Sequence, residues 1–137
     1  MNIKNYNKAY ETNNHTTYSC QYHIVFCPKY GRNVLVGSIK EKLEELILEK
    51  QDEYQYKVLE QDIMPDSVHL YINVYPPIGV FTIVNKIKGY TSRMLRELFP
   101  ELKKRLPTMW NINKFISSVG DASLIEIQEF IKNQKNV

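Results

Sequence analysis

The stretch that most constrains the fold is residues 62–74, DIMPDSVHLYINV, near the middle of the chain. Pro65 and its two neighbours predict a turn, because proline fixes its own φ and biases the preceding residue toward extended geometry. From Ser67 to Val74, polar and apolar residues alternate strictly. A period of two predicts a β-strand with one apolar face turned to a core, and the turn joins it to the preceding strand as a hairpin.

The other face of this predicted strand carries Ser67, His69, Tyr71 and Asn73. A polar strand face that includes a histidine has two interpretations, a functional site or an ordinary solvated sheet face. Spacing alone favours the solvated face, because half-buried antiparallel strands commonly alternate in this way.

Size and composition indicate one globular domain. The 137 residues are enough to bury a core, and 43% hydrophobic with 24% charged residues is ordinary for such a domain. We expect a flexible N-terminal arm at residues 1–16 and a single domain at 17–137. No apolar run has membrane-spanning length and no signal-peptide pattern is present, so we expect a cytoplasmic protein with no membrane partner.

Charge and cysteine usage narrow the class further. A formal net charge of +3 permits a nucleic-acid partner without requiring one. Cys20 and Cys27 are the only cysteines and show no zinc-type spacing, so we expect two reduced thiols on one strand.

The remaining periodicities predict a split βαβ order. Ser38 is the expected N-cap of the first helix, and Ser123 with Glu126 forms a capping-box pattern at the last one. The predicted strands are 18–27, ended by Pro28, then 54–63, 67–74 and 109–119. The predicted helices are 38–50, 79–98 and about 123–134, with 101–107 as a basic connector. This order predicts an α+β fold, a ferredoxin-like four-stranded antiparallel sheet with two helices on one face, plus a C-terminal helix.

The helix expected at 79–98 is basic as well as amphipathic. Its cationic residues are Lys86, Lys88, Arg93 and Arg96, with Tyr90 nearby. A basic stripe on a helix is most often a solvated face. The alternative is a track for phosphates, because cations on one rigid element gain affinity by releasing counterions.

Taken together, five segments resemble a known family, the small HUH, single-tyrosine transposases of the TnpA type, which act on single-stranded DNA. The segments are YHIVFCPKYGRNVLVG at 22–37, IMPDSVHLYI at 63–72, VNKIKGYTSRMLRELFPEL at 84–102, the Trp110 strand ending at Gly120, and EFIKNQ at 129–134. The resemblance covers about residues 18–134. Each segment alone is a weak signal, but their order and spacing are specific.

The resemblance implies a particular chemistry. In the family, two histidines flanking a bulky apolar residue and a glutamine on the last helix hold Mg²⁺ or Mn²⁺, which polarises the scissile phosphate. A tyrosine one helical turn before the glutamine attacks and forms a 5′-phosphotyrosine. The family enzyme is a homodimer that binds DNA hairpins through basic helix and sheet surfaces, and the tyrosine helix of one subunit can complete the metal site of the other.

This sequence departs from that pattern at two positions. The first histidine of the motif falls on Ser67, while His69 and Gln134 match the second histidine and the glutamine. The tyrosine falls on Phe130, which has no oxygen to attack with. The resemblance therefore implies a metal site with two good ligands of three and a missing nucleophile; Tyr71 is a weak candidate for a relocated one.

Three hypotheses follow for function. The first is a transposase-derived homodimer that binds hairpin-forming single-stranded DNA, or a structured RNA, but does not cleave it. The second is a metal-dependent transposase that forms a 5′-phosphotyrosine. In that case other residues supply the metal ligand and the nucleophile, or the sequence is an engineered inactive version of an active enzyme. The third is a regulator or interaction module with no nucleic-acid role, which predicts that charge reversal on the basic helix changes nothing.

Overall fold

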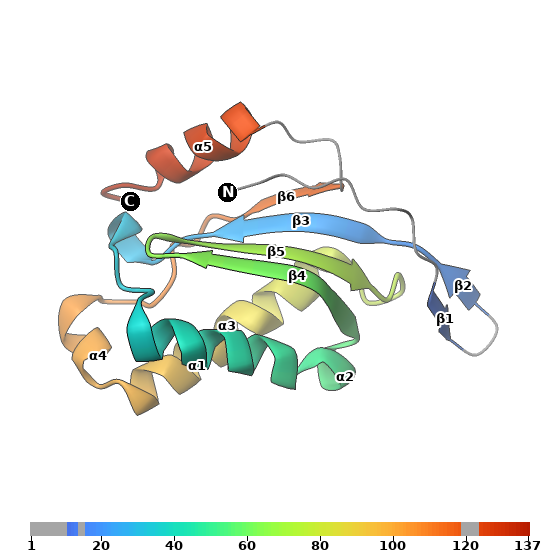
Figure 1. Cartoon of the computed structure of the whole chain (residues 1–137), viewed down its shortest axis with the longest axis horizontal. Coiled ribbons are helices and arrows are strands. Elements are labelled where there is room, and N and C mark those ends of the chain that lie inside the picture. Colours follow the sequence, from blue (N-terminus) through green and yellow to red (C-terminus); the bar gives the residue numbers. More distant parts are fainter. Residues whose placement is uncertain (1–10, 14–15, 119–123) are drawn as a thin grey trace.

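A four-stranded antiparallel sheet forms the centre of the computed structural model, which describes residues 11–13, 16–118 and 124–137 (Figure 1). Its strand order is β4-β5-β3-β6. The strands are β3 (Gln21–Phe26), β4 (Tyr56–Met64), β5 (Ser67–Val74) and β6 (Phe115–Ser118). This is the ferredoxin-like arrangement, so the predicted fold class is confirmed.

Helices cover both faces of the sheet (Figure 1). One face packs against α1 (Gly37–Glu49) and α3 (Val80–Leu98), and α5 (Leu124–Asn133) lies over the other. The smaller elements are β1 (Glu11–Asn13), β2 (Thr16–Tyr18), η1 (Lys29–Gly31), α2 (Gln51–Tyr54) and α4 (Glu101–Arg105). No helix among the described residues is both long and apolar enough to cross a bilayer.

The main core lies between the sheet and the pair α1 and α3. Helical spacing places Leu43 and Ile47 of α1 and Ile83 of α3 on buried faces, where they meet Leu70 and Ile72 of β5. Each such side chain contributes about 1.5–3 kcal/mol when fully buried. The core therefore fixes the position of β5, and with it the polar residues on its other face.

The hairpin and the two long helices match their predicted positions, but several boundaries differ. The first helix begins at Gly37 after Val36, with no side-chain cap, so the assignment of Ser38 as N-cap was wrong. The connector predicted at 101–107 contains α4, in which Glu101 lies in the first turn and three cations lie in the last. That distribution of charge favours a helix through its dipole.

The last predicted strand is much shorter than expected. Of residues 109–118, which the structure describes, Phe115–Ser118 pairs in the sheet, while Trp110 makes an isolated bridge with Pro28. Lys88 explains the difference, because its ammonium group binds backbone carbonyls of residues 111–113 and draws that segment away from extended pairing.

At the N-terminus, Glu11–Asn13 pairs with Thr16–Tyr18, and Lys57 forms a 2.9 Å ion pair with Glu11. Part of the segment that we expected to be a flexible arm is thus a strand. The division at residues 1–16 and 17–137 stays a prediction. Ser123 of the predicted capping box lies outside the described residues.

Candidate functional site

The polar face of β5 is buried rather than solvated. Ser67, His69, Tyr71 and Asn73 are each 0–2% exposed. Antiparallel pairing with β3 sets Val25 opposite His69 and His23 opposite Tyr71, so these side chains share one face of the sheet. The face lies under α5 (Figure 1). The interpretation of an ordinary wet sheet face was therefore wrong.

Ser67 links His69 to a carboxylate. The Ser67 hydroxyl donates to Asp66 Oδ1 at 3.3 Å and lies 2.9 Å from His69 Nε2. Because the hydroxyl proton is used by Asp66, the Ser67 oxygen accepts from His69, which places the imidazole proton on Nε2. Burial, reinforced by neighbouring His23, lowers the pKa of His69 to about 3, so the ring is neutral.

A second histidine, which sequence reasoning did not select, lies beside this pair. His23 stacks on Tyr71 with ring centroids 4.4 Å apart, and its centroid is 5.9 Å from that of His69. Burial lowers the pKa of His23 to about 4. The alternation of residues 22–27 places His23 on one sheet face, but the register that brings it to His69 is set only by strand pairing.

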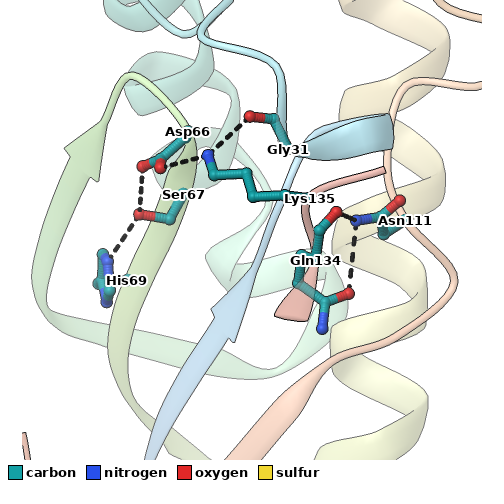
Figure 2. A network of polar contacts seen from close by, with 7 residues as sticks. All are labelled: Gly31, Asp66, Ser67, His69, Asn111, Gln134 and Lys135. Carbon is teal, nitrogen blue, oxygen red and sulfur yellow. Dashed lines mark hydrogen bonds and ion pairs between the residues drawn. The ribbon is translucent and has the colours of Figure 1, made fainter. Parts of the chain in front are cut away.

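The C-terminal segment is anchored to the same end of β5. Lys135 Nζ donates to Asp66 Oδ2 at 2.7 Å and to the Gly31 carbonyl at 2.8 Å (Figure 2). Gly31 has a φ of +61°, and a Cβ there would lie 2.6 Å from Lys135 Cδ, so only glycine fits this approach. A chain of contacts thus runs from His69 through Ser67 and Asp66 to the residue after Gln134.

Gln134 is buried, and its amide is already engaged. Its Oε1 accepts from Asn111 and Asn113 at 3.4 and 3.3 Å, and its Nε2 donates to the Phe130 carbonyl at 3.2 Å. The amide therefore secures the end of α5 against residues 111–113 (Figure 2).

Phe130 lies on the site side of α5. Its ring packs against Phe115 with centroids 5.7 Å apart, and Phe115 lies 6.4 Å from His23 edge to face. Phe130, the residue that the resemblance aligns with the family tyrosine, thus lies over the sheet face that carries His69. The rings of Phe115 and His23 connect it to that face.

The three-ligand set implied by the family does not fit a divalent cation here. The Ser67 hydroxyl is held between Asp66 and His69, and the Gln134 oxygen already has two donors. Within the described part of the chain, no three His, Cys, Asp or Glu side chains form a group that could hold a metal ion. Within the described residues, Nδ1 of His69 is the atom of the predicted set that is buried without a hydrogen-bond partner.

The four predicted phosphate-binding residues divide into two pairs. Lys88 donates to the carbonyls of Asn111, Ile112 and Asn113 at 2.7–3.5 Å, and burial lowers its pKa to about 8. Arg96 donates to the carbonyls of Leu106 and Pro107. These two side chains are structural ties to the segment after α4 and are not displayed for a ligand.

Lys86 and Arg93 are the exposed pair, and aromatic rings accompany them. Lys86 lies 5.5 Å from the Tyr54 ring, Arg93 lies 5.7 Å from the Tyr90 ring, and Lys50 lies 4.4 Å from the Tyr90 ring. We call these five residues the basic–aromatic cluster. Tyr54 lies on α2 and Lys86, Tyr90 and Arg93 lie on α3, while Lys50 stands between α1 and α2. These helices are on the side of the sheet opposite α5.

Comparison with known proteins identifies the family. The family described as "Transposase IS200 like" matches residues 16–134, nearly all of the chain. The chain belongs to the IS200-like transposase family. The resemblance stated from sequence is thereby confirmed at the level of the family.

Individual relatives agree with this IS200-like assignment. The chain is 34% identical over 123 residues to the transposase for insertion sequence element IS200 of Salmonella typhimurium, covering 88% of this chain and 80% of the relative. It is 29% identical over 119 residues to the ISDra2 transposase TnpA of Deinococcus radiodurans, covering 85% of each.

Two solved structures share the fold of this IS200-like chain. A Deinococcus radiodurans protein assigned as a transposase matches with a TM-score of 0.84 at 25% identity, over 93% of this chain and 99% of its own. A REP-associated tyrosine transposase bound to a REP hairpin matches with a TM-score of 0.55 at 9% identity, over 94% and 68%, and shows the fold alone.

Proposed function

We propose that this IS200-like chain binds hairpin-forming single-stranded DNA as a homodimer and forms no covalent intermediate with it. The observation that carries the proposal is Phe130, a ring without a hydroxyl, packed on Phe115 where the family has its attacking tyrosine. The second support is the hydroxyl of Ser67, which is consumed by Asp66 and His69 in place of a metal-binding imidazole.

The basic–aromatic cluster supports the binding part of the proposal. Lys86 and Arg93 supply charge for phosphates, and Tyr54 and Tyr90 supply rings on which unpaired bases can stack. A structural neighbour is described as bound to a DNA hairpin, which supports a hairpin as the kind of ligand. A structured RNA presents the same phosphates and bases and is the competing ligand in the assay.

Fluorescence anisotropy with labelled DNA hairpins tests binding. We expect the double variant Lys86→Ala with Arg93→Ala to weaken binding at least tenfold. The matched control, Lys103→Ala with Lys104→Ala, removes the same charge from exposed positions on α4 and should change affinity much less. Equal losses in both variants, or no binding by the unaltered chain, would overturn the proposed site. Sedimentation should give twice the mass of the chain.

Denaturing gels with hairpin DNA and Mg²⁺ or Mn²⁺ test the absence of cleavage. The unaltered chain should give no covalent protein–DNA adduct. Ser67→His combined with Phe130→Tyr should give one, whereas Ser67→His alone should not, because Phe130 still lacks an oxygen. An adduct formed by the unaltered chain would support the working transposase instead.

A further inference from the structure

Two buried imidazoles lie side by side on the sheet face under α5. His23 of β3 and His69 of β5 are diagonal neighbours in the antiparallel ladder and are 2% and 0% exposed. Their ring centroids are 5.9 Å apart. Both nitrogens of His23 and Nδ1 of His69 are buried and have no hydrogen-bond partner among the residues that the structure describes.

The hydrogen bonds of His69 determine which of its nitrogens is free. Its Nε2–H donates to Ser67, whose own hydroxyl donates to Asp66, so Nδ1 carries an unshared lone pair. A metal-binding imidazole usually donates the N–H of its other ring nitrogen to a carboxylate or another acceptor, which fixes its tautomer. Here Asp66 acts on His69 through the Ser67 hydroxyl. Ser67, at the position of the family's first histidine, therefore orients the second one.

His23 supplies the second lone pair. A neutral imidazole always has one unprotonated nitrogen, and neither nitrogen of His23 meets a donor within the described residues. Leaving a buried acceptor without a partner costs about 1–3 kcal/mol. Two such acceptors on one sheet face indicate a bound ligand between them that accepts lone pairs, such as a metal cation or a hydrogen-bond donor.

We propose that His23 and His69 form a two-nitrogen site for a borderline divalent cation such as Zn²⁺, Co²⁺ or Ni²⁺. Imidazole nitrogen suits these ions, whereas Mg²⁺ takes oxygen ligands almost exclusively. The remaining coordination positions go to water or to an oxygen of a bound anion. Asp62 stands opposite His69 in the β4 register, on the same face, and its carboxylate adds attraction for a cation.

A bridging water is the rival occupant. One water that donates to Nδ1 of His69 and pairs with His23 would also satisfy these nitrogens, since buried waters typically serve polar groups of this kind. The two occupants differ in what metal titration does to the imidazole nitrogens: a coordinated nitrogen changes its ¹⁵N resonance, and a hydrated one does not respond.

The test is a Zn²⁺ titration of the ¹⁵N-labelled full chain, observed through long-range imidazole ¹H–¹⁵N spectra. We expect the ¹⁵N resonances of His23 and His69 to shift together and to stop at one equivalent, with Nδ1 as the affected nitrogen of His69. A tenfold excess of Mg²⁺ should not reverse the shift. Absence of any shift, a shift at His15 alone, or a shift of only one of the two imidazoles would overturn the site.

Variants provide the second readout by calorimetric titration of Zn²⁺. His23→Gln and His69→Gln should each weaken binding at least tenfold, and His15→Gln, which changes the chain's remaining histidine, should leave binding unchanged. Circular dichroism shows whether each variant is folded, and the ¹⁵N spectra decide the matter in the unaltered chain if one is not. Zn²⁺ binding equal to that of the unaltered chain in folded His23→Gln would contradict the proposal.

The cation site stands apart from hairpin binding. The titration uses no DNA, and the basic–aromatic cluster lies on the helices of the opposite side of the sheet. A chain that binds Zn²⁺ but no hairpin would keep this inference and lose the proposed function, and the reverse result would do the opposite.

Discussion

Ser67 is the residue that the resemblance aligns with the first histidine of the family motif, and its contacts show what the side chain does here. Its hydroxyl accepts a hydrogen bond from His69 and donates one to Asp66, whose second oxygen accepts from Lys135. The serine is therefore a buried connection between the sheet and the C-terminal segment.

Replacing this hydroxyl should destabilise the protein. Ser67→Ala leaves the buried Nε2–H of His69 without an acceptor, and we expect a loss of about 1–3 kcal/mol in the free energy of unfolding. Urea denaturation measures it. Ser117→Ala is the control, because that hydroxyl makes an exposed hydrogen bond to the adjacent Ser118 carbonyl. Equal stability of the two variants would contradict the role of Ser67.

The two cysteines should differ sharply in reactivity. Cys27 is buried, and burial raises the pKa of its thiol to about 12, so almost no thiolate exists near neutral pH. Cys20 is partly exposed. Native protein should therefore take up one equivalent of iodoacetamide at pH 8 and two in concentrated urea, as counted by mass spectrometry. Labelling of Cys27 in folded protein at the rate of Cys20 would be inconsistent with its burial.

Among the elements, α3 combines two kinds of lysine two residues apart. Lys88 is bound to three backbone carbonyls, whereas Lys86 is exposed over the ring of Tyr54. Hydrogen bonds from a charged donor are worth more than neutral ones, so Lys88 largely determines the path of residues 111–113.

Lys88→Met should therefore loosen this segment. We expect faster amide hydrogen exchange at residues 111–114 and a loss of about 1–3 kcal/mol of stability, since the three carbonyls lose their charged donor. Lys86→Met removes the same charge from the same helix and should change neither quantity appreciably. The prediction is wrong if both variants exchange alike.

The end of α5 depends on one ion pair and a close backbone approach. Lys135→Ala removes the donor to Asp66 and to the Gly31 carbonyl, so α5 should open more often. Hydrogen exchange of the amides in 124–134 should accelerate severalfold, because exchange follows local opening. Lys132→Ala, an exposed position on the same helix, is the control, and an equal acceleration there would remove the special role of Lys135.

How much of the fold the sequence predicts depends on how local the cause is. β5, the hairpin at Pro65 and the helix α3 follow from periodicity and turn chemistry within a few residues. The start of α1 at Gly37 and the shortness of β6 do not, because packing and the carbonyl contacts of Lys88 decide them. Rules based on neighbouring residues cannot predict the contact between Lys88 and Asn111, which are 23 positions apart.

The same distinction holds for the candidate site. The resemblance selected His69, Gln134 and positions 67 and 130, because motif spacing is a local property; their roles stay predictions. His23 was missed, since its approach to His69 depends on the register between β3 and β5. The sequence also did not predict that Lys88 and Arg96 bind backbone carbonyls. A lysine or arginine in a helical segment gives the same sequence pattern whether its side chain faces solvent or a carbonyl.

In the molecule as a whole, the two sides of the sheet carry different groups. The altered family site lies under α5, and the basic–aromatic cluster lies on the α1 and α3 side (Figure 1). Changes at Ser67 and Phe130 therefore leave the cluster intact. This separation means that a change on the α5 side of the sheet need not alter the exposed cations and rings on the other side.

Salt dependence tests that surface quantitatively. Each phosphate neutralised by a cation releases counterions, so the logarithm of the association constant falls with the logarithm of salt concentration by about 0.7–0.9 per contact. Removing Lys86 and Arg93 together should reduce this slope by about 1.4–1.8, since two contacts are lost. Lys88→Met should leave the slope unchanged, because its ammonium group is occupied by backbone carbonyls. Anisotropy titrations between 50 and 300 mM salt, roughly the range in which such contacts are screened, give all three slopes. If Lys88→Met lowers the slope by about 0.7–0.9, the value of one contact, then Lys88 leaves its carbonyls to contact phosphate, and the division of the four cations into two pairs is wrong.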